Sequence, residues 1–473
     1  MAMRVFLETF GCQMNILDSE LVEGQLRAAG HSFVDHPDDA NVVLLNTCSV
    51  REVTENKVLS RLGKLKERKD AGEKVVVGVL GCMAERAHEG LTNKRPFIDV
   101  MIGPSKLYDT RAMVEAAFNE GSSHQSLSYF VKRKGSAEPA ILSPLDDLEL
   151  LDRLRPIGDQ PKPWQAYVRI TRGCNKFCSF CVVPRTRGPE MHRPPDSIIE
   201  EVKRLVDRGA LEVTLLGQTI NHYFYQDQTR WSFADLLFQV HEQVPKLKRL
   251  RFLTSYPRDF TDEALDVMKS CDRICKYLHI PAQSGSNKVL RDMNRGYDLE
   301  TYLSLIDRAK SRMPNINLIG DMIVGFPNES EEDFELSLEL LRCVRYKNVF
   351  VFKYSPRPDT VADKRFIDNV PIAIKKQRNN VMLTLQKDIA LEHHQAMVGQ
   401  TIAVLCEGTA KLDLNSQGIV RLRGNNDNIK LTGRTEGDHI IHFEGPRTLT
   451  GTIVNVNIDS ARALSLGGNL LVS

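Results

Sequence analysis

The sequence predicts an α/β protein with an N-terminal doubly wound parallel-sheet domain, a central partial (β/α)6 barrel and a C-terminal small β-barrel. In two long stretches, apolar runs alternate with amphipathic helical segments, as expected for parallel strands joined by helical crossovers. The end of the chain instead carries short strand-like runs separated by turn residues, which favours a small barrel. We divide the chain into an N-terminal domain (1–118), a linker (119–163), a central core (164–395) and a C-terminal domain (396–473).

In the N-terminal domain, a cysteine follows the carboxyl end of each apolar run by two residues. The predicted strands are 4–10, 41–46 and 74–80, and the cysteines are Cys12, Cys48 and Cys82. Parallel strands of a doubly wound sheet end at one edge, where such folds bind ligands, so we expect the three thiols to converge. Three widely spaced cysteines are also common as buried packing residues, and that alternative stays open here.

The central region has six predicted strands alternating with helical segments. They are 166–170, 213–216, 249–253, 277–280, 319–324 and 349–352, with helices over 197–208, 301–312 and 331–344. Six strands predict an incomplete barrel, whose chemistry should lie at the carboxyl ends of the strands. Between the first two domains, 119–163 is rich in linker-like residues, with a possible strand at 126–131.

Directly after the first central strand comes a cysteine triplet, Cys174, Cys178 and Cys181, spaced by three and then two residues. A four-iron cluster bound by three thiolates leaves one iron free for an outside ligand. A zinc site or three buried free cysteines are the alternatives. Zinc sites are usually closed by four ligands in paired motifs, and the only local candidate for a further ligand is His192.

Three N-terminal blocks and the triplet together resemble the methylthiotransferase family of radical S-adenosylmethionine enzymes. The blocks are Gly11-Cys12-Gln-Met-Asn15, Asn46-Thr-Cys48-Ser-Val-Arg51 and Gly81-Cys82-Met-Ala-Glu-Arg86. The resemblance covers nearly the whole chain. It implies two [4Fe-4S] clusters, one held by the triplet that cleaves S-adenosyl-L-methionine and an auxiliary one held by the N-terminal cysteines. One departure is Thr219, where relatives more often carry Asn.

Small and hydrogen-bonding residues at the ends of the central strands are candidate cofactor contacts. Gln218, Ser255 and Gln283 are placed to hold the amino acid and ribose parts of the cofactor, and Phe180 to stack on its adenine. Turns favour the same residue types, so each of these positions has a purely structural alternative.

The resemblance implies sulfur insertion and methyl transfer at carbon 2 of N6-isopentenyladenosine, next to the anticodon of a tRNA. That C–H bond is not activated for polar chemistry, whereas an electron passed to the sulfonium yields a 5′-deoxyadenosyl radical that can attack it. The expected partners are the tRNA anticodon stem-loop and a reductant such as flavodoxin or ferredoxin, with the protein a monomer. The final domain resembles the TRAM domain, with Arg434, His442 and Phe443 as candidate RNA contacts.

Two rival activities within the enzyme class use the same architecture, on threonylcarbamoyl-adenosine in tRNA or on an aspartate of a ribosomal protein. The Gln-Met pair after Cys12 argues against both, since their first-cysteine loops usually carry Lys-Val or Pro-Lys. A non-catalytic iron–sulfur redox sensor that binds RNA is the rival from another class. Release of 5′-deoxyadenosine by the reduced protein would discriminate against it.

Composition and cysteine usage indicate the cellular compartment in which we expect the protein to work. A net charge of +2 and 42% hydrophobic residues are ordinary for a globular protein, and no run of 18 apolar residues occurs. Ten cysteines without a secretory signal favour metal or redox chemistry in the cytoplasm over disulfides. We interpret Cys271, Cys275, Cys343 and Cys406 as packing residues.

Overall fold

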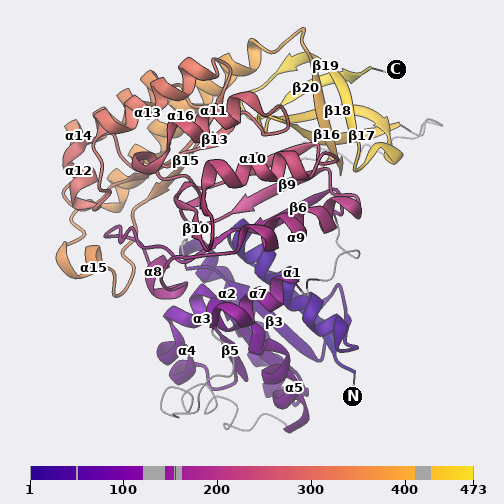
Figure 1. Cartoon of the computed structure of the whole chain (residues 1–473). Helices are drawn as coiled ribbons and strands as arrows, with labels where there is room; N and C mark the ends of the chain where they lie inside the picture. Colours follow the sequence, from indigo (N-terminus) through magenta and orange to yellow (C-terminus); the bar gives the residue numbers. More distant parts are fainter. Residues whose placement is uncertain are drawn as a thin grey trace.

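A computed structural model describes residues 2–49, 52–120, 144–153, 155, 162–410 and 428–471. Figure 1 shows the N-terminal domain and the C-terminal barrel at opposite ends of the molecule, with the central core between them. Two predicted strands lie outside the described residues: the one at 126–131, and 419–422, one of the short strand-like runs predicted at the end of the chain.

The N-terminal domain is a five-stranded parallel sheet in the order β2-β1-β3-β4-β5. Its elements are β1 (Arg4–Thr9), α1 (Gln13–Ala28), β2 (Ser32–Phe33), β3 (Val42–Thr47), α2 (Glu52–Asp70), β4 (Val76–Gly81), α3 (Cys82–Arg86), α4 (His88–Lys94), β5 (Val100–Ile102) and α5 (Thr110–Glu120). On one face of β3, Leu44 packs in a cluster with Leu17 of α1; on the other, Leu45 packs in a cluster with Leu62 of α2. Helices therefore cover both faces, which confirms the doubly wound prediction.

Helix α7 (Pro144–Arg153) lies within the segment that we expect to be a linker. Its Leu151 is buried in the same apolar cluster as Leu17 of the N-terminal domain. Its Asp152 is buried against arginines of the central core. This helix therefore packs between the two domains.

The central core contains two three-stranded parallel sheets, β12-β9-β6 and β13-β14-β15, linked by a bridge between Leu250 and Ile274. Its strands are β6 (Gln165–Arg169), β7 (Thr171–Arg172), β8 (Met191–His192), β9 (Glu212–Leu216), β10 (Phe224–Gln226), β11 (Arg230–Ser232), β12 (Arg249–Phe252), β13 (Tyr277–His279), β14 (Asn317–Val324) and β15 (Asn348–Lys353). Strands β6 and β15 are the two edges of an open barrel. The six predicted parallel strands are confirmed.

Six helices pack on the outer face of these two sheets: α9 (Pro195–Asp207), α10 (Phe233–Gln243), α11 (Asp262–Ser270), α13 (Leu299–Arg312), α14 (Glu331–Val344) and α16 (Ile372–Gln395). The core also contains three short helices, α8 (Val183–Thr186), α12 (Asn287–Asp292) and α15 (Val361–Arg365). Alternate strand residues such as Val213, Leu250 and Leu318 enter one large apolar cluster with the six outer helices. The remaining strand residues face inward, toward the axis of the half-barrel.

The C-terminal domain is a closed barrel in the order β16-β17-β18-β20-β19, which confirms the predicted barrel. Its strands are β16 (Thr401–Thr409), β17 (Asn428–Thr435), β18 (Ile440–Pro446), β19 (Ile453–Ala461) and β20 (Leu466–Leu470).

The prediction that Phe443 contacts RNA is wrong, because its ring is buried in the barrel core. The prediction that Cys343 is a packing residue is also wrong, because Cys343 is exposed.

A buried ion network joins the N-terminal domain to the core. Asp18 of α1 pairs with Arg169 of β6 at 3.2 Å, and Arg169 pairs with Asp152 of α7 at 2.7 Å. Asp152 also accepts a hydrogen bond from Arg172 at 2.7 Å and lies 3.6 Å from Arg193. Burial alone would raise the pKa of Asp152, but the three guanidinium charges outweigh it and hold this pKa below its usual range.

Replacing Asp152 by Asn should destabilise the fold by about 3–5 kcal/mol, because three buried guanidinium groups would lose their shared carboxylate. We expect a lower urea midpoint, followed by the fluorescence of Trp164 and Trp231. The matched control is Asp207→Asn, which removes an exposed carboxylate 3.1 Å from Lys246 and should hardly move the midpoint. Equal midpoints for Asp152→Asn and the wild type would contradict the role of the network.

Candidate functional site

The cysteine triplet lies on a loop that is held against the segment after it. Gly173 has a φ of +66°, and a side chain there would clash with the backbone of Gly188 and Pro189. The Cys174 N–H donates to the Gly188 carbonyl at 3.2 Å. Glycine is therefore required for the tight return of the chain before the first thiol of the triplet.

Each triplet thiol has a distinct environment, and the three are close enough to affect one another. The Cys174 sulfur lies 3.4 Å from the Thr219 hydroxyl, and the Cys178 sulfur accepts a hydrogen bond from Arg295 at 3.3 Å. Burial raises the pKa of Cys181 to about 12, and the charges of Cys178 and Cys174 add to the effect. Burial also raises the pKa of Cys174. A bound metal must therefore displace the protons from these two sulfurs.

The arrangement does not fit a single zinc ion. Among the described residues, no group of three or more His, Cys, Asp or Glu side chains is placed to hold one metal ion. His192, the candidate fourth zinc ligand, instead accepts a hydrogen bond from the Phe224 N–H at 3.4 Å, and its ring lies against Tyr223. An iron–sulfur cluster fits better, because each of its thiolates binds a different iron.

The three N-terminal cysteines lie together at the carboxyl edge of the parallel sheet. Cys12 immediately precedes α1, Cys48 follows β3, and Cys82 opens α3 directly after β4. A side chain at Gly11 would meet the side chain of Cys48, so only glycine permits this approach of the two loops.

The thiols of this set also influence one another. A hydrogen bond with the Cys48 thiol lowers the pKa of Cys12 to about 6, with the charge of Arg187 assisting against the effect of burial. Burial raises the pKa of Cys82, and the charge of Cys12 raises it further. Cys12 as a whole residue is exposed, although its thiol is hydrogen-bonded to the buried Cys48, and Cys82 is also buried.

A short segment that follows the triplet separates the two cysteine sets. Helix α8 packs against α3, and the Thr186 hydroxyl at its end hydrogen-bonds the Cys82 thiol. The next residue, Arg187, donates to Asn15 at 2.9 Å and to Asp18 at 2.8 Å, and its charge faces the thiols of Cys12 and Cys82. The N-terminal cysteine set therefore lies against the segment that directly follows the triplet.

Two of the predicted cofactor contacts carry buried polar atoms without hydrogen-bond partners. Among the described residues, Ser255 Oγ and Gln283 Oε1 are buried and lack a hydrogen-bond partner. Gln283 also has a φ of +78°, a strained backbone conformation that is retained mainly at functional sites. Thr171 Oγ1, directly before the triplet, is a third such atom. A bound ligand with donors and acceptors would satisfy these groups.

The other two predicted contacts lie nearby in the fold. Phe180, between the second and third triplet cysteines, is partly buried against the cluster formed by Val289, Met293 and Phe326. Gln218 is half-buried and follows the end of β9. Their placement agrees with a ligand that crosses the ends of several strands.

Four residues of this region carry no signal that sequence analysis could use. Arg295 comes from the turn after α12, more than 100 positions from Cys178, and it bonds that cysteine only through the fold. Thr186 and Arg187 belong to no metal motif. Thr219 was visible only as a departure from related sequences, yet it contacts Cys174.

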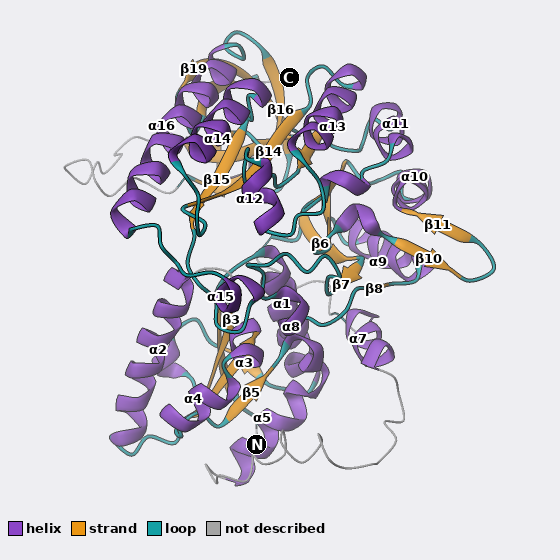
Figure 2. Cartoon of the chain, turned by 90° about the vertical axis from the view of Figure 1, so that its left-hand side faces the viewer, coloured by secondary structure: helices purple, strands orange, loops and turns teal. Residues whose placement is uncertain are grey.

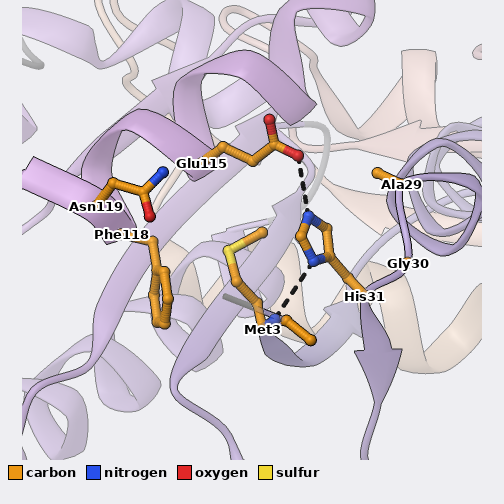
Figure 3. A pocket seen from close by; sticks show the side chains of 8 residues that line it. Met3, Ala29, Gly30, His31, Glu115, Phe118 and Asn119 are labelled. Atoms are coloured by element: carbon orange, nitrogen blue, oxygen red, sulfur yellow. Dashed lines mark hydrogen bonds and ion pairs between the residues drawn. The ribbon is translucent and has the colours of Figure 1, made fainter.

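A separate hollow of about 390 Å³ lies near the N-terminus and contains none of the predicted site residues. Figure 3 shows His31 within it, with Nε2 3.0 Å from Glu115 and Nδ1 accepting from the Met3 N–H at 3.3 Å. This pair ties β2 and α5 to the start of the chain.

Comparisons with known proteins identify the family. Residues 168–341 match the model of the radical SAM superfamily, and residues 4–103 match the model described as uncharacterized protein family UPF0004. A protein of Rhodopirellula baltica is 39% identical over 99% of this chain and 96% of its own length. One of Moorella thermoacetica is 38% identical over 98% and 97%. Both are named tRNA-2-methylthio-N(6)-dimethylallyladenosine synthase.

Solved structures support the fold alone. The radical S-adenosylmethionine methyltransferase TsrM from Kitasatospora setae, with cobalamin and a [4Fe-4S] cluster, aligns with a TM-score of 0.55 at 13% identity, over 77% of this chain and 74% of its own. No helix in the described part of the chain is long and apolar enough to cross a membrane.

The half-barrel with its three-cysteine loop defines a radical SAM enzyme, a class that uses a [4Fe-4S] cluster and S-adenosylmethionine. With full-length relatives above 30% identity, the chain belongs to the radical SAM methylthiotransferases, in the family of the tRNA-2-methylthio-N(6)-dimethylallyladenosine synthases.

In the iron-free protein, alkylation of Cys12 should rise through a midpoint near pH 6, because the thiolate is the reactive form and its pKa is lowered. Replacing Cys48 by Ala removes the main cause, so the midpoint should move up toward the ordinary value of 9.0. Mass spectrometry after brief iodoacetamide labelling measures both. A wild-type midpoint near 9, or no difference between the proteins, would contradict the thiol pairing.

Proposed function

We propose that this protein installs a methylthio group on carbon 2 of N6-dimethylallyladenosine next to the anticodon of tRNA. The observation that supports the proposal is that Thr186 and Arg187, on the segment that follows the triplet, contact the N-terminal cysteine set of another domain. The full-length relationship to synthases of that name gives the proposal its substrate.

In this proposal the triplet holds the cluster that binds S-adenosylmethionine, and Cys12, Cys48 and Cys82 hold an auxiliary [4Fe-4S] cluster. When bound, the first cluster with S-adenosylmethionine supplies a radical able to take hydrogen from an unactivated C–H bond, and the second supplies a place to hold sulfur. Three protein thiolates on each cluster leave one iron of each for these roles.

The residues around the clusters orient and shield the reactants. Ser255 and Gln283 offer buried hydrogen-bonding atoms to S-adenosylmethionine, while Phe180 and Gln218 border the same strand ends. Arg295 donates to the Cys178 sulfur, which stabilises negative charge on that thiolate. Ser255 and Gln283 are buried, so their polar atoms meet a bound ligand rather than bulk water.

The partners follow from the substrate. We assign RNA binding to the C-terminal barrel (396–473), through its outer surface because Phe443 points into the core. Arg434 is also engaged within the protein, since it pairs with Asp438 at 2.7 Å. We further propose a monomer that works in the cytoplasm and takes its electrons from a flavodoxin or ferredoxin.

Removing each cysteine set should abolish a different part of the reaction. Replacing Cys174 and Cys178 together by Ala should abolish 5′-deoxyadenosine formation, because the first cluster cannot assemble. Replacing Cys48 by Ala should leave that formation measurable but stop thiolation, because only the auxiliary cluster is lost. Anaerobically reconstituted protein, dithionite, S-adenosylmethionine and isopentenylated tRNA provide the assay, with nucleoside mass spectrometry as the readout.

The matched control is Cys343→Ala, which removes an exposed cysteine on α14 outside both sets and should retain both activities. Methylthiolated tRNA from the Cys48→Ala protein would refute the proposed role of the auxiliary cluster. Continued release of 5′-deoxyadenosine from the Cys174 and Cys178 double variant would refute the assignment of the triplet.

A further inference from the structure

The inner face of the second half of the barrel carries side chains that neither the fold nor the proposed cofactor sites explain. Along β13, β14 and β15, outward residues such as Leu278, Met322 and Val349 are buried in the main apolar cluster. Figure 2 shows α14 and α16 beside β14 and β15, on that outer side. Because strand residues alternate between faces, His279, Asp321 and Phe350 belong to the inner face.

These three residues form a continuous group. Asp321 and Phe350 are register partners on adjacent parallel strands. His279 Nε2 lies 3.3 Å from an Asp321 carboxylate oxygen, and the His279 and Phe350 rings meet edge to face with centroids 6.5 Å apart. The group combines an aromatic ring, a carboxylate and an imidazole within one patch.

Phe350 is exposed in a way that packing does not account for. Its side chain is 45% exposed, although it lies in the middle of a strand whose outer face is covered by helices. A planar ligand can stack on an exposed ring without displacing any packed side chain, and such stacking is favourable. Asp321 beside it disfavours phosphate and favours a neutral partner that carries a hydrogen-bond donor.

The group is joined through the backbone to two of the predicted cofactor contacts. The Ser255 N–H donates to the His279 carbonyl at 3.0 Å, and the Gln283 N–H donates to the Asp321 carbonyl at 2.9 Å. The side chains of Ser255 and Gln283 are those with buried atoms that lack partners. The predicted cofactor contacts and this group therefore lie on neighbouring segments of the same half-barrel.

We propose that Phe350, Asp321 and His279 form the binding site of the target adenine, which is flipped out of its RNA loop into the half-barrel. The Phe350 ring stacks on the base, and the Asp321 carboxylate accepts the hydrogen bond of its N6–H. His279 is a positioning residue that orients Asp321. This assignment rests on the proposed function, because it supplies a site within the protein for the base of that substrate.

The test uses full-length, anaerobically reconstituted protein and anticodon stem-loop RNAs at one fixed salt concentration. One RNA carries the target adenosine, one an abasic nucleotide in its place, and one a purine nucleoside that lacks the N6 amine. Wild-type protein should bind the abasic RNA about tenfold more weakly than the adenosine RNA, the loss of one stacked base.

Phe350→Leu should bind adenosine and abasic RNA equally, because the ring that senses the base is gone. Asp321→Leu should remove the preference that the wild type shows for adenosine over the purine nucleoside, because no acceptor remains for the N6–H. The controls are Phe238→Leu, which alters a similarly exposed ring (42%) on α10, and Asp207→Leu, which removes an exposed carboxylate. Both should keep the wild-type ratios, and iron content and unfolding temperature check that every variant is folded.

A Phe350→Leu protein that keeps the wild-type ratio of affinities for adenosine and abasic RNA would contradict the proposed adenine-binding site. So would a wild-type ratio near one in protein that thiolates tRNA normally. If instead the affinity ratios are as expected but wild-type protein forms no methylthio product, the adenine-binding site is supported and the proposed function is contradicted. The two proposals therefore fail by different measurements.

Discussion

The structure depends on Asp18, a buried carboxylate on the first helix that binds two arginines of another domain. One of its oxygens pairs with Arg169 of β6, and the other with Arg187 at the end of the triplet loop. Charges in such surroundings are costly unless paired with good geometry, so the two domains are held in one relative position. That position brings the N-terminal cysteine set to the carboxyl ends of the barrel strands.

Arg187 has a second effect that follows from the same placement. It carries a fixed positive charge to the thiols of Cys12 and Cys82, in a region where burial opposes negative charge on sulfur. A cluster held by three thiolates has the same need for compensating charge. The contact that aligns the domains therefore also stabilises the site that it helps to form.

Much of this architecture could be predicted from sequence, because it rests on local patterns. Cys174, Cys178 and Cys181 form a compact motif, and the strand-end positions of Cys12, Cys48 and Cys82 follow from parallel topology. The short strands β2 and β5 escaped prediction, since two or three residues carry no periodicity. Arg187, Thr219 and Arg295 also escaped, because their roles arise from contacts between distant segments. Phe443 was assigned outward, since a strand pattern alone does not fix which face of a small barrel is buried.

The proposed reaction requires two iron–sulfur clusters, one on either side of the short segment that holds Thr186 and Arg187. The most direct measurement is electron paramagnetic resonance of the reduced, fully reconstituted protein together with its iron content. The structure predicts about eight irons per chain and a spectrum broadened by coupling between the two clusters, which simplifies when Cys48 is replaced by Ala. About four irons per chain, or a spectrum that is the plain sum of two independent clusters, would contradict it.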